Sequence, residues 1–173
     1  MPMDMVLSLC RLRPFREGDQ PSIARYANNR RIWINLRDRF PHPYTLADAD
    51  AWVREVAGKD PPKQCGVEIG GEVVGGIGLT LQEDIHRRSA EIGYWLGEPF
   101  WGRGIMSEVV PAFTAYALTT FDLCRIYAGV FEWNPASARI LEKGGYNLEG
   151  RLRKSVTKDG RTMDQFLYAR VRT

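Results

Sequence analysis

Apolar and polar positions along the chain follow two repeating patterns, one typical of β-strands and the other of α-helices. Alternation over about four to eight residues predicts strands, whereas apolar residues spaced three and four apart predict helices. A Gly-Gly turn and a Lys-Asp-Gly turn join neighbouring strand-like segments into two hairpins. The predicted strands are 6–13, 64–69, 72–81, 89–96, 125–131, 146–155 and 163–171. The predicted helices are 20–28, 46–57, 105–121 and 135–143.

Capping residues mark the starts of three of these helices. Asp19 precedes the first helix, and a carboxylate there is suited to accept backbone N–H groups of the first turn. Thr45 and Asp48 stand three positions apart, as in a capping box. Asn134 is followed by Pro135, a residue favoured at the first helical position. We therefore expect Asp19, Thr45 and Asn134 to be the caps.

The elements are mixed along the chain, with no repeat, linker or low-complexity segment, so we predict one α+β domain over residues 1–173 with a mostly antiparallel central sheet. With 44% hydrophobic and 26% charged residues, the composition is that of a soluble globular protein. No apolar stretch approaches the ~20 residues of a membrane span, and the first residues do not resemble a secretory signal. Cys10, Cys65 and Cys124 form no closely spaced pair, which favours a reducing, cytoplasmic location.

Charge and metal-ligating residues narrow the candidate partners. The net charge of +3 suits an anionic ligand but is too small to predict a nucleic-acid partner. The two histidines are far apart and the cysteines are scattered, so we predict no metal site. Exposed hairpin ends and the aromatic content permit a homodimer without requiring one.

The segment from Glu91 to Glu108 carries the clearest chemistry. A predicted strand runs into a tight loop with Gly102 and Gly104 and then into a helix. The two glycines allow a sharp turn and close approach of a ligand, and the free N–H groups at the helix start form an anion site. Arg103 adds a positive charge there or faces solvent. The loop lacks the Gly-Lys-Ser/Thr of a Walker A motif and the third glycine of a dinucleotide fingerprint. On its own, it is equally consistent with a turn made for packing.

This segment closely resembles the cofactor motif of the GNAT acetyltransferase superfamily, Q/R-x-x-G-x-G/A, with Trp101 in the place of Gln or Arg and Met106 in the place of the small residue. The sequence EIGYWLGEPFWGRG is similar to the corresponding segment of the RimJ/RimL-like branch. Three other segments resemble that branch in the same order. They are residues 37–45, the N-x-x-S helix followed by Gly-Tyr at 134–146, and the final hairpin at 148–169.

The resemblance implies a fold in which two parallel strands, here 89–96 and 125–131, splay apart and hold acetyl-CoA, with helix 105–121 as a right-handed crossover between them. It implies that the pantetheine arm pairs with the first strand, where a bulge would aim an N–H at the thioester and stabilise the oxyanion. The expected cofactor contacts are Trp95, Leu96, Trp101, Gly102, Arg103, Gly104, Ile105, Met106, Ser107 and Asn134.

The resemblance also suggests catalytic residues. Glu91 is the candidate general base, since an amine must lose a proton before it reacts; the other interpretation is a structural carboxylate paired with an arginine. Ser137 is the candidate partner of the departing thiol, or else a first-turn serine that satisfies helix N–H groups. Tyr94 and Tyr146 are weaker candidates for the acid, because buried aromatic residues are commonly core residues.

The acceptor site is expected between the first helices and the last hairpin, with Arg37, Phe40 and Tyr44 as liners. Several arginines there suit an acidic or carboxylate-bearing acceptor, or they form a solvated basic face. The leading prediction is acetyl transfer from acetyl-CoA to the α-amine of a protein N-terminus. The alternatives are transfer to a small amine, such as an antibiotic, a polyamine or an amino acid, and a CoA-binding module without catalysis.

Overall fold

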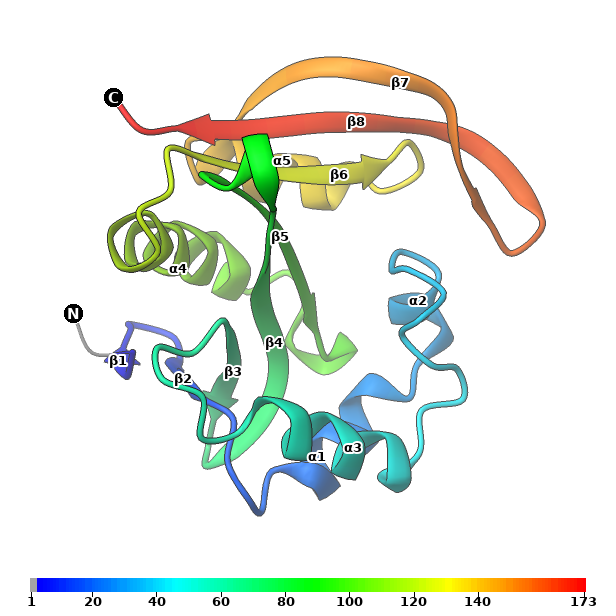
Figure 1. Ribbon diagram of the computed structural model, residues 1–173. Helices are drawn as coiled ribbons and strands as arrows, with labels where there is room; N and C mark the ends of the chain where they lie inside the picture. Colours follow the sequence, from blue (N-terminus) through cyan, green and yellow to red (C-terminus); the bar gives the residue numbers. More distant parts are fainter. Residues whose placement is uncertain (1–2) are drawn as a thin grey trace.

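The computed structural model describes residues 3–173 and contains one eight-stranded sheet with the strand order β1-β2-β3-β4-β5-β6-β8-β7 (Figure 1). The strands are β1 (Met5–Val6), β2 (Arg11–Pro14), β3 (Gln64–Ile69), β4 (Glu72–Leu81), β5 (Ser89–Leu96), β6 (Arg125–Phe131), β7 (Asn147–Lys158) and β8 (Arg161–Val171). The α-helices are α1 (Gln20–Ala27), α2 (Arg30–Trp33), α3 (Leu46–Val56), α4 (Ile105–Thr120) and α5 (Pro135–Lys143). The predicted α+β class and mostly antiparallel sheet are confirmed.

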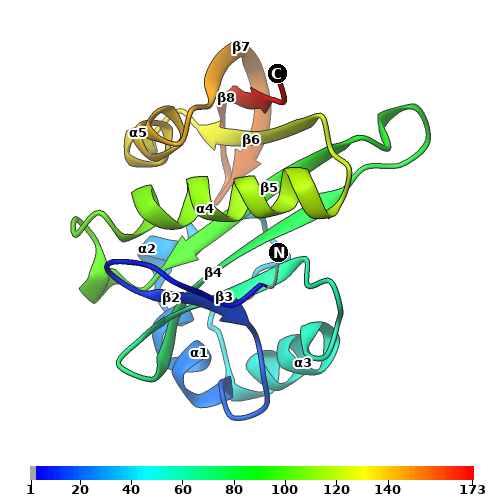
Figure 2. The ribbon, with the colours of Figure 1, turned by 90° about the vertical axis from the view of Figure 1, so that its left-hand side faces the viewer.

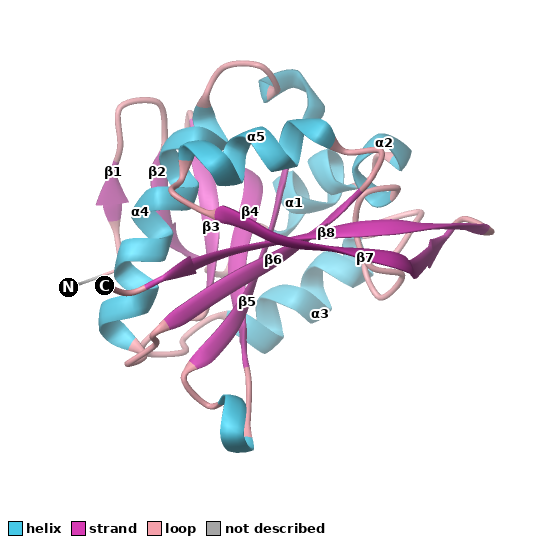
Figure 3. Cartoon of the chain, turned by 90° about the horizontal axis from the view of Figure 1, so that it is seen from above, coloured by secondary structure: helices cyan, strands magenta, loops and turns pink. Residues whose placement is uncertain are grey.

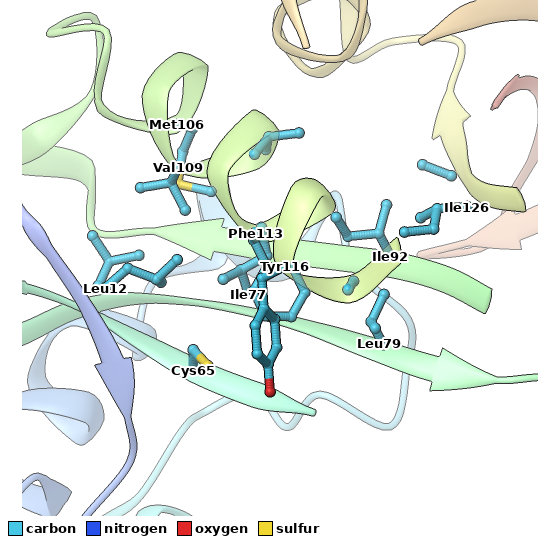
Figure 4. Close-up of a cluster of buried hydrophobic side chains, with 14 of the residues drawn as sticks. Leu12, Cys65, Ile77, Leu79, Ile92, Met106, Val109, Phe113, Tyr116 and Ile126 are labelled. Carbon is cyan, nitrogen blue, oxygen red and sulfur yellow. The ribbon is translucent and has the colours of Figure 1, made fainter. Parts of the chain in front are cut away.

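The helices cover both faces of the sheet. α4 lies on one side of the central strands β4 and β5, whereas α2 lies on the other (Figure 1). α5 is on the same side as α4, and α1 and α3 pack together near the β2–β3 end (Figure 2). The larger core lies beneath α4, where Phe113 and Tyr116 pack in one cluster with Ile77, Leu79 and Ile92 of the sheet (Figure 4). A smaller core joins α1 and α3 to the other face.

β5 and β6 form the only parallel pair among the described strands, and they pair over a short distance. The register joins Ser89 to Arg125 and ends where Glu91 faces Tyr127. Beyond Glu91, β5 continues to Leu96 beside β4, and β6 continues beside β8. The two parallel strands therefore separate after Glu91, and the predicted wedge is present between their C-terminal halves.

The first strand and the first cap were predicted wrongly. Residues 6–13 form two short strands joined by a turn, because the Glu108 carboxylate of α4 accepts the N–H groups of Ser8 and Leu9 at 2.8 and 3.0 Å. The Asp19 side chain does not cap α1. Its oxygens instead accept hydrogen bonds from Arg13 at 2.8 and 2.9 Å, since this buried guanidinium needs a carboxylate partner.

The β7–β8 hairpin is longer than predicted and extends well beyond the rest of the sheet (Figure 3). Its tip folds back onto α2 and the segment that follows it. Lys158, which is 2% exposed, donates a hydrogen bond to Asp38 at 3.0 Å and lies 3.7 Å from the centre of the Trp33 ring. Arg30 of α2 pairs with Asp159 in the hairpin turn. These contacts fix one border of the region in front of β5 and β6.

Candidate functional site

The loop before α4 has the backbone of an anion site. Gly102 and Gly104 have φ angles of 73° and 80°, a region that residues with a Cβ rarely adopt. Gly104 is the N-cap of α4 and has no side chain to accept the first N–H groups of the helix. A Cβ at Gly102 would meet no atom within 4 Å, so a ligand has room to approach the backbone there. These features fit a pyrophosphate.

The side chains of the residues after Gly104 point away from such a ligand. Ile105 and Met106 are 3% and 5% exposed and belong to the core beneath α4. Figure 4 shows Met106 in this core. The backbone N–H groups of both residues remain at the helix start, next to Ser107, which is partly exposed. The Arg103 guanidinium is exposed and lies 5.4 Å from the centre of the Phe100 ring.

Trp101 ties this loop to the end of β5. Its indole N–H donates a hydrogen bond to the carbonyl oxygen of Leu96 at 2.7 Å. The Arg31 guanidinium of α2 lies 5.3 Å from the centre of the Trp101 ring and also pairs with Glu98. Asn29 donates a hydrogen bond to the other oxygen of Glu98 at 2.7 Å. The loop before α4 is thus linked to α2 on the opposite face of the sheet.

Strand geometry identifies which backbone groups of β5 face the wedge. The Gly97 N–H donates to the Val74 carbonyl at 2.7 Å, and hydrogen-bonded pairs alternate along an antiparallel ladder. The backbone groups of Trp95 are therefore directed at β4, and those of Tyr94 and Leu96 are directed at β6. Of the two residues predicted to pair with the pantetheine arm, only Leu96 faces the wedge, and Trp101 already holds its carbonyl.

The predicted bulge in β5 is not found in the ladder over residues 90–96. The pairing with β4 runs without a shift from Ala90 opposite Leu81 to Leu96 opposite Gly75. The wedge needs no bulge here, because β5 and β6 stop pairing after Glu91 and each continues beside another strand. The bulge prediction is therefore wrong for this chain.

Ser137 and Tyr94 meet across the wedge. The Ser137 hydroxyl, on the first turn of α5, lies 2.6 Å from the Tyr94 hydroxyl, which β5 directs to the α4–α5 side. Burial raises the pKa of Tyr94, so its phenol keeps its proton at neutral pH. The Asn134 amide oxygen accepts the Ser137 N–H at 3.4 Å and caps α5 as predicted.

Glu91 lies on the other face of β5, paired with Arg37. The Arg37 guanidinium donates to both carboxylate oxygens at 2.5 Å. Tyr127 is the strand neighbour of Glu91, and its pKa is raised by burial and further by the Glu91 charge, while Arg37 lowers it. The structure therefore pairs Arg37, which was predicted to line the acceptor site, with Glu91, the predicted general base.

The other predicted acceptor residues form an aromatic wall. The Phe40 ring lies 5.1 Å from that of Tyr44 and 6.1 Å from that of Trp95. Tyr44 is 7% exposed and packs in the α1–α3 core, where burial raises its pKa to about 12. Phe40 is half-buried and is therefore more exposed than Tyr44.

Sequence reasoning undervalued Tyr94. The alternation of β5 was a usable signal, because Tyr94 has the same parity as Ile92 and Leu96, whose side chains are buried on the α4 side. Tyr146, considered for the same role, instead bonds Thr114 of α4 at 2.7 Å and is 2% exposed. The Trp101 contact had no signal in the sequence.

Residues 3–173 contain neither a metal-ligand cluster nor a helix suited to span a membrane. No group of three or more His, Cys, Asp or Glu side chains in this range could hold a metal ion. None of the helices in the described part of the chain is long and apolar enough to cross a membrane.

Comparison with known proteins agrees with this geometry. Residues 10–147 match the model of the acetyltransferase (GNAT) domain. An uncharacterized N-acetyltransferase of Bacillus subtilis, YoaA, is 39% identical over 101 residues, which cover 58% of this chain and 56% of that protein. The ribosomal-protein-serine acetyltransferase of Escherichia coli is 32% identical over 100 residues, or 58% of this chain and 55% of that protein. The chain thus spans a little more than half the length of these relatives.

A similar fold occurs in solved structures. RimL, a ribosomal L7/L12 α-N-protein acetyltransferase in complex with coenzyme A, superposes with a TM-score of 0.83 over 96% of each chain at 23% identity. At this identity the likeness concerns the fold. Together with the domain match over most of the sequence, it gives the splayed strands and the glycine loop a common explanation. The chain belongs to the GNAT acetyltransferase family.

Proposed function

We propose that this chain transfers the acetyl group of acetyl-CoA to a primary amine, with the α-amine of a protein N-terminus as the favoured acceptor. One observation carries the proposal: the wedge between β5 and β6 begins at Glu91 and lies beside the uncapped N-terminus of α4 at Gly104. An anionic carrier held at the helix start can extend into a gap in the sheet that is bordered on both faces by polar side chains.

The residues present fit acetyl-CoA. The backbone N–H groups after Gly104 would hold the pyrophosphate, and the Leu96 N–H and Tyr94 backbone would pair with the pantetheine arm. The amide nitrogen of Asn134 remains for a polar contact, because its cap uses the amide oxygen. When bound, the carrier supplies an acetyl group activated as a thioester.

Side chains on the two faces would divide the proton transfers. Ser137 would hold a proton for the departing thiolate, with the Tyr94 phenol behind it as a second donor at 2.6 Å. On the other face, Glu91 would hold the incoming ammonium and accept its proton. Arg37 occupies Glu91 in the free protein, so the amine must take the place of that guanidinium.

The acceptor class rests on two relatives. The Escherichia coli relative is named for acetylation of a ribosomal protein, and the RimL structure is named for the α-amine of ribosomal L7/L12. Both names support a protein N-terminus as the acceptor.

The test is acetyl-CoA turnover with a panel of peptides and a panel of small amines, each monitored by release of free thiol. Peptides with a free N-terminus should be acetylated, and N-terminally blocked copies should not. Ser137→Ala should lower kcat by about a hundredfold. Thr119→Val is the matched control, since it removes a helix hydroxyl that bonds a carbonyl in the last turn of α4. Turnover of small amines alone would refute the protein acceptor.

A further inference from the structure

The acceptor face of β5 presents one carboxylate held by one guanidinium. Glu91 lies on a central strand and is 22% exposed, whereas Arg37 comes from the segment between α2 and α3 and is 59% exposed. Arg37 is the only side chain within residues 3–173 that forms an ion pair with Glu91. The carboxylate is therefore fixed, and the guanidinium is free to turn toward water or toward another anion.

Open space lies directly beside this ion pair. Gly93 is two residues after Glu91, so its missing side chain would stand on the same face of the strand. A Cβ at Gly93 would have nothing within 4 Å. β5 and β6 part immediately after Glu91, so a ligand over Gly93 lies at the mouth of the wedge.

Charge balance restricts what enters this space. A purely cationic amine that took Arg37's place at Glu91 would leave the guanidinium beside a second cation and without an anion. A ligand that carries both an ammonium and a carboxylate replaces one ion pair by two, and every charge keeps a partner. The planar guanidinium meets both oxygens of Glu91 through Nη2, and its geometry also suits the two oxygens of a ligand carboxylate.

We propose that Arg37 and Glu91 form a clasp that opens to bind an acceptor whose amine lies within a few bonds of a carboxylate. The ammonium takes the place of Arg37 on Glu91, and the carboxylate pairs with the released Arg37. A free α-amino acid has this chemistry, and so does a protein N-terminus whose first residue is aspartate or glutamate. The clasp rests on the proposed function, because it presumes that the acceptor enters in front of Glu91.

Binding to the protein saturated with CoA tests the clasp without any acetyl transfer. Calorimetry compares two matched pairs: the C-terminally amidated peptides Asp-Ala-Ala-Gly and Asn-Ala-Ala-Gly, and L-leucine with L-leucinamide. The carboxylate-bearing member of at least one pair should bind about tenfold tighter or more. The pair that shows this preference identifies the source as a protein N-terminus or a free amino acid.

Two variants isolate the role of Arg37. Arg37→Gln should abolish the preference, and Arg39→Gln should retain it. Arg39 is a matched control because it is exposed on the same segment and forms no ion pair with residues 3–173. Equal affinities within both pairs would overturn the clasp, and so would a preference that survives in Arg37→Gln.

Turnover with acetyl-CoA then separates the clasp from the proposed function. Acetylation of these acceptors without any carboxylate preference in binding overturns the clasp and leaves the function standing. A preference that depends on Arg37, without acetylation of any acceptor, supports the clasp as a binding site and overturns the proposed function.

Discussion

Replacing Gly104 with alanine should weaken acetyl-CoA binding and lower stability only through backbone strain. Gly104 has a φ of 80°, so a Cβ there costs about 1–2 kcal/mol of unfolding free energy. The nearest protein atom to that Cβ is in Leu9 at 3.9 Å, so no clash adds to the cost. Relief of the strained φ would turn the N–H groups that follow it. Loss of one charge-assisted hydrogen bond costs about 1.5–3 kcal/mol, which is about tenfold to a hundredfold in Kd.

A second glycine separates backbone strain from the cofactor effect. Gly160, in the β7–β8 turn, has a φ of 73° and nothing within 4 Å of an added Cβ. Gly160→Ala should therefore lower the urea midpoint as Gly104→Ala does but leave the Kd of acetyl-CoA unchanged by calorimetry. Wild-type affinity in Gly104→Ala, or equal losses in both variants, would show that this loop does not hold the pyrophosphate.

Three other perturbations test the structure away from the site. Arg13→Met should lower the unfolding free energy by about 3–5 kcal/mol in urea, because two carboxylates lose a guanidinium that is 2% exposed. Only Cys124 should react quickly with an aromatic disulfide reagent in the native protein, because burial raises the pKa of the other two thiols to about 11 and about 12. The pKa of Asp164 lies below its ordinary 3.8 because the Lys154 N–H and Arg151 bond it, so its stabilisation is present above that pH and lost as pH falls through the lower value. Asp164→Asn should therefore differ less from wild type at about pH 2 than at about pH 5 in urea midpoints.

Features that depend on near neighbours in sequence were predictable. Thr45 and Asp48 form the capping box because both partners lie within one helical turn. The β3–β4 hairpin has its predicted bounds, since the Gly70-Gly71 turn adopts positive φ at both positions and pairs Ile69 with Glu72. The glycine loop was equally predictable from the sequence, because few residues other than glycine adopt a φ near 80°, the value at Gly104.

Features that depend on distant charges were not predictable. Glu108 bends the N-terminal strand through Ser8 from 100 residues away, and nothing in the alternation of 6–13 reveals that carboxylate. Asp19 has the residue type of a cap, yet the buried Arg13 competes for it and wins, because an unpaired buried guanidinium costs several kcal/mol. The prediction failed where burial, unknown from the sequence, decided between two partners.

The candidate site divides along the same line. Ser137 and the Gly104 loop follow from local motifs, and Tyr94 follows from strand parity once Ser137 is placed opposite. The pairing of Arg37 with Glu91 joins residues 54 positions apart, on a loop with no regular pattern. In the proposed function, Glu91 is a structural carboxylate while it is paired with Arg37 and a base once the amine has replaced that guanidinium.

The contacts of α2 show why the acceptor is harder to predict from the family motif than the acetyl transfer itself. A helix of four residues does not persist on its own. Arg31 ties it to Glu98 and the Trp101 ring, 67 or more residues away, and Arg30 ties it to Asp159, 129 residues away. The conformation of the glycine loop depends on its own few residues, so a short motif predicts it. The proposed acceptor border depends instead on these long-range contacts, which no short motif contains.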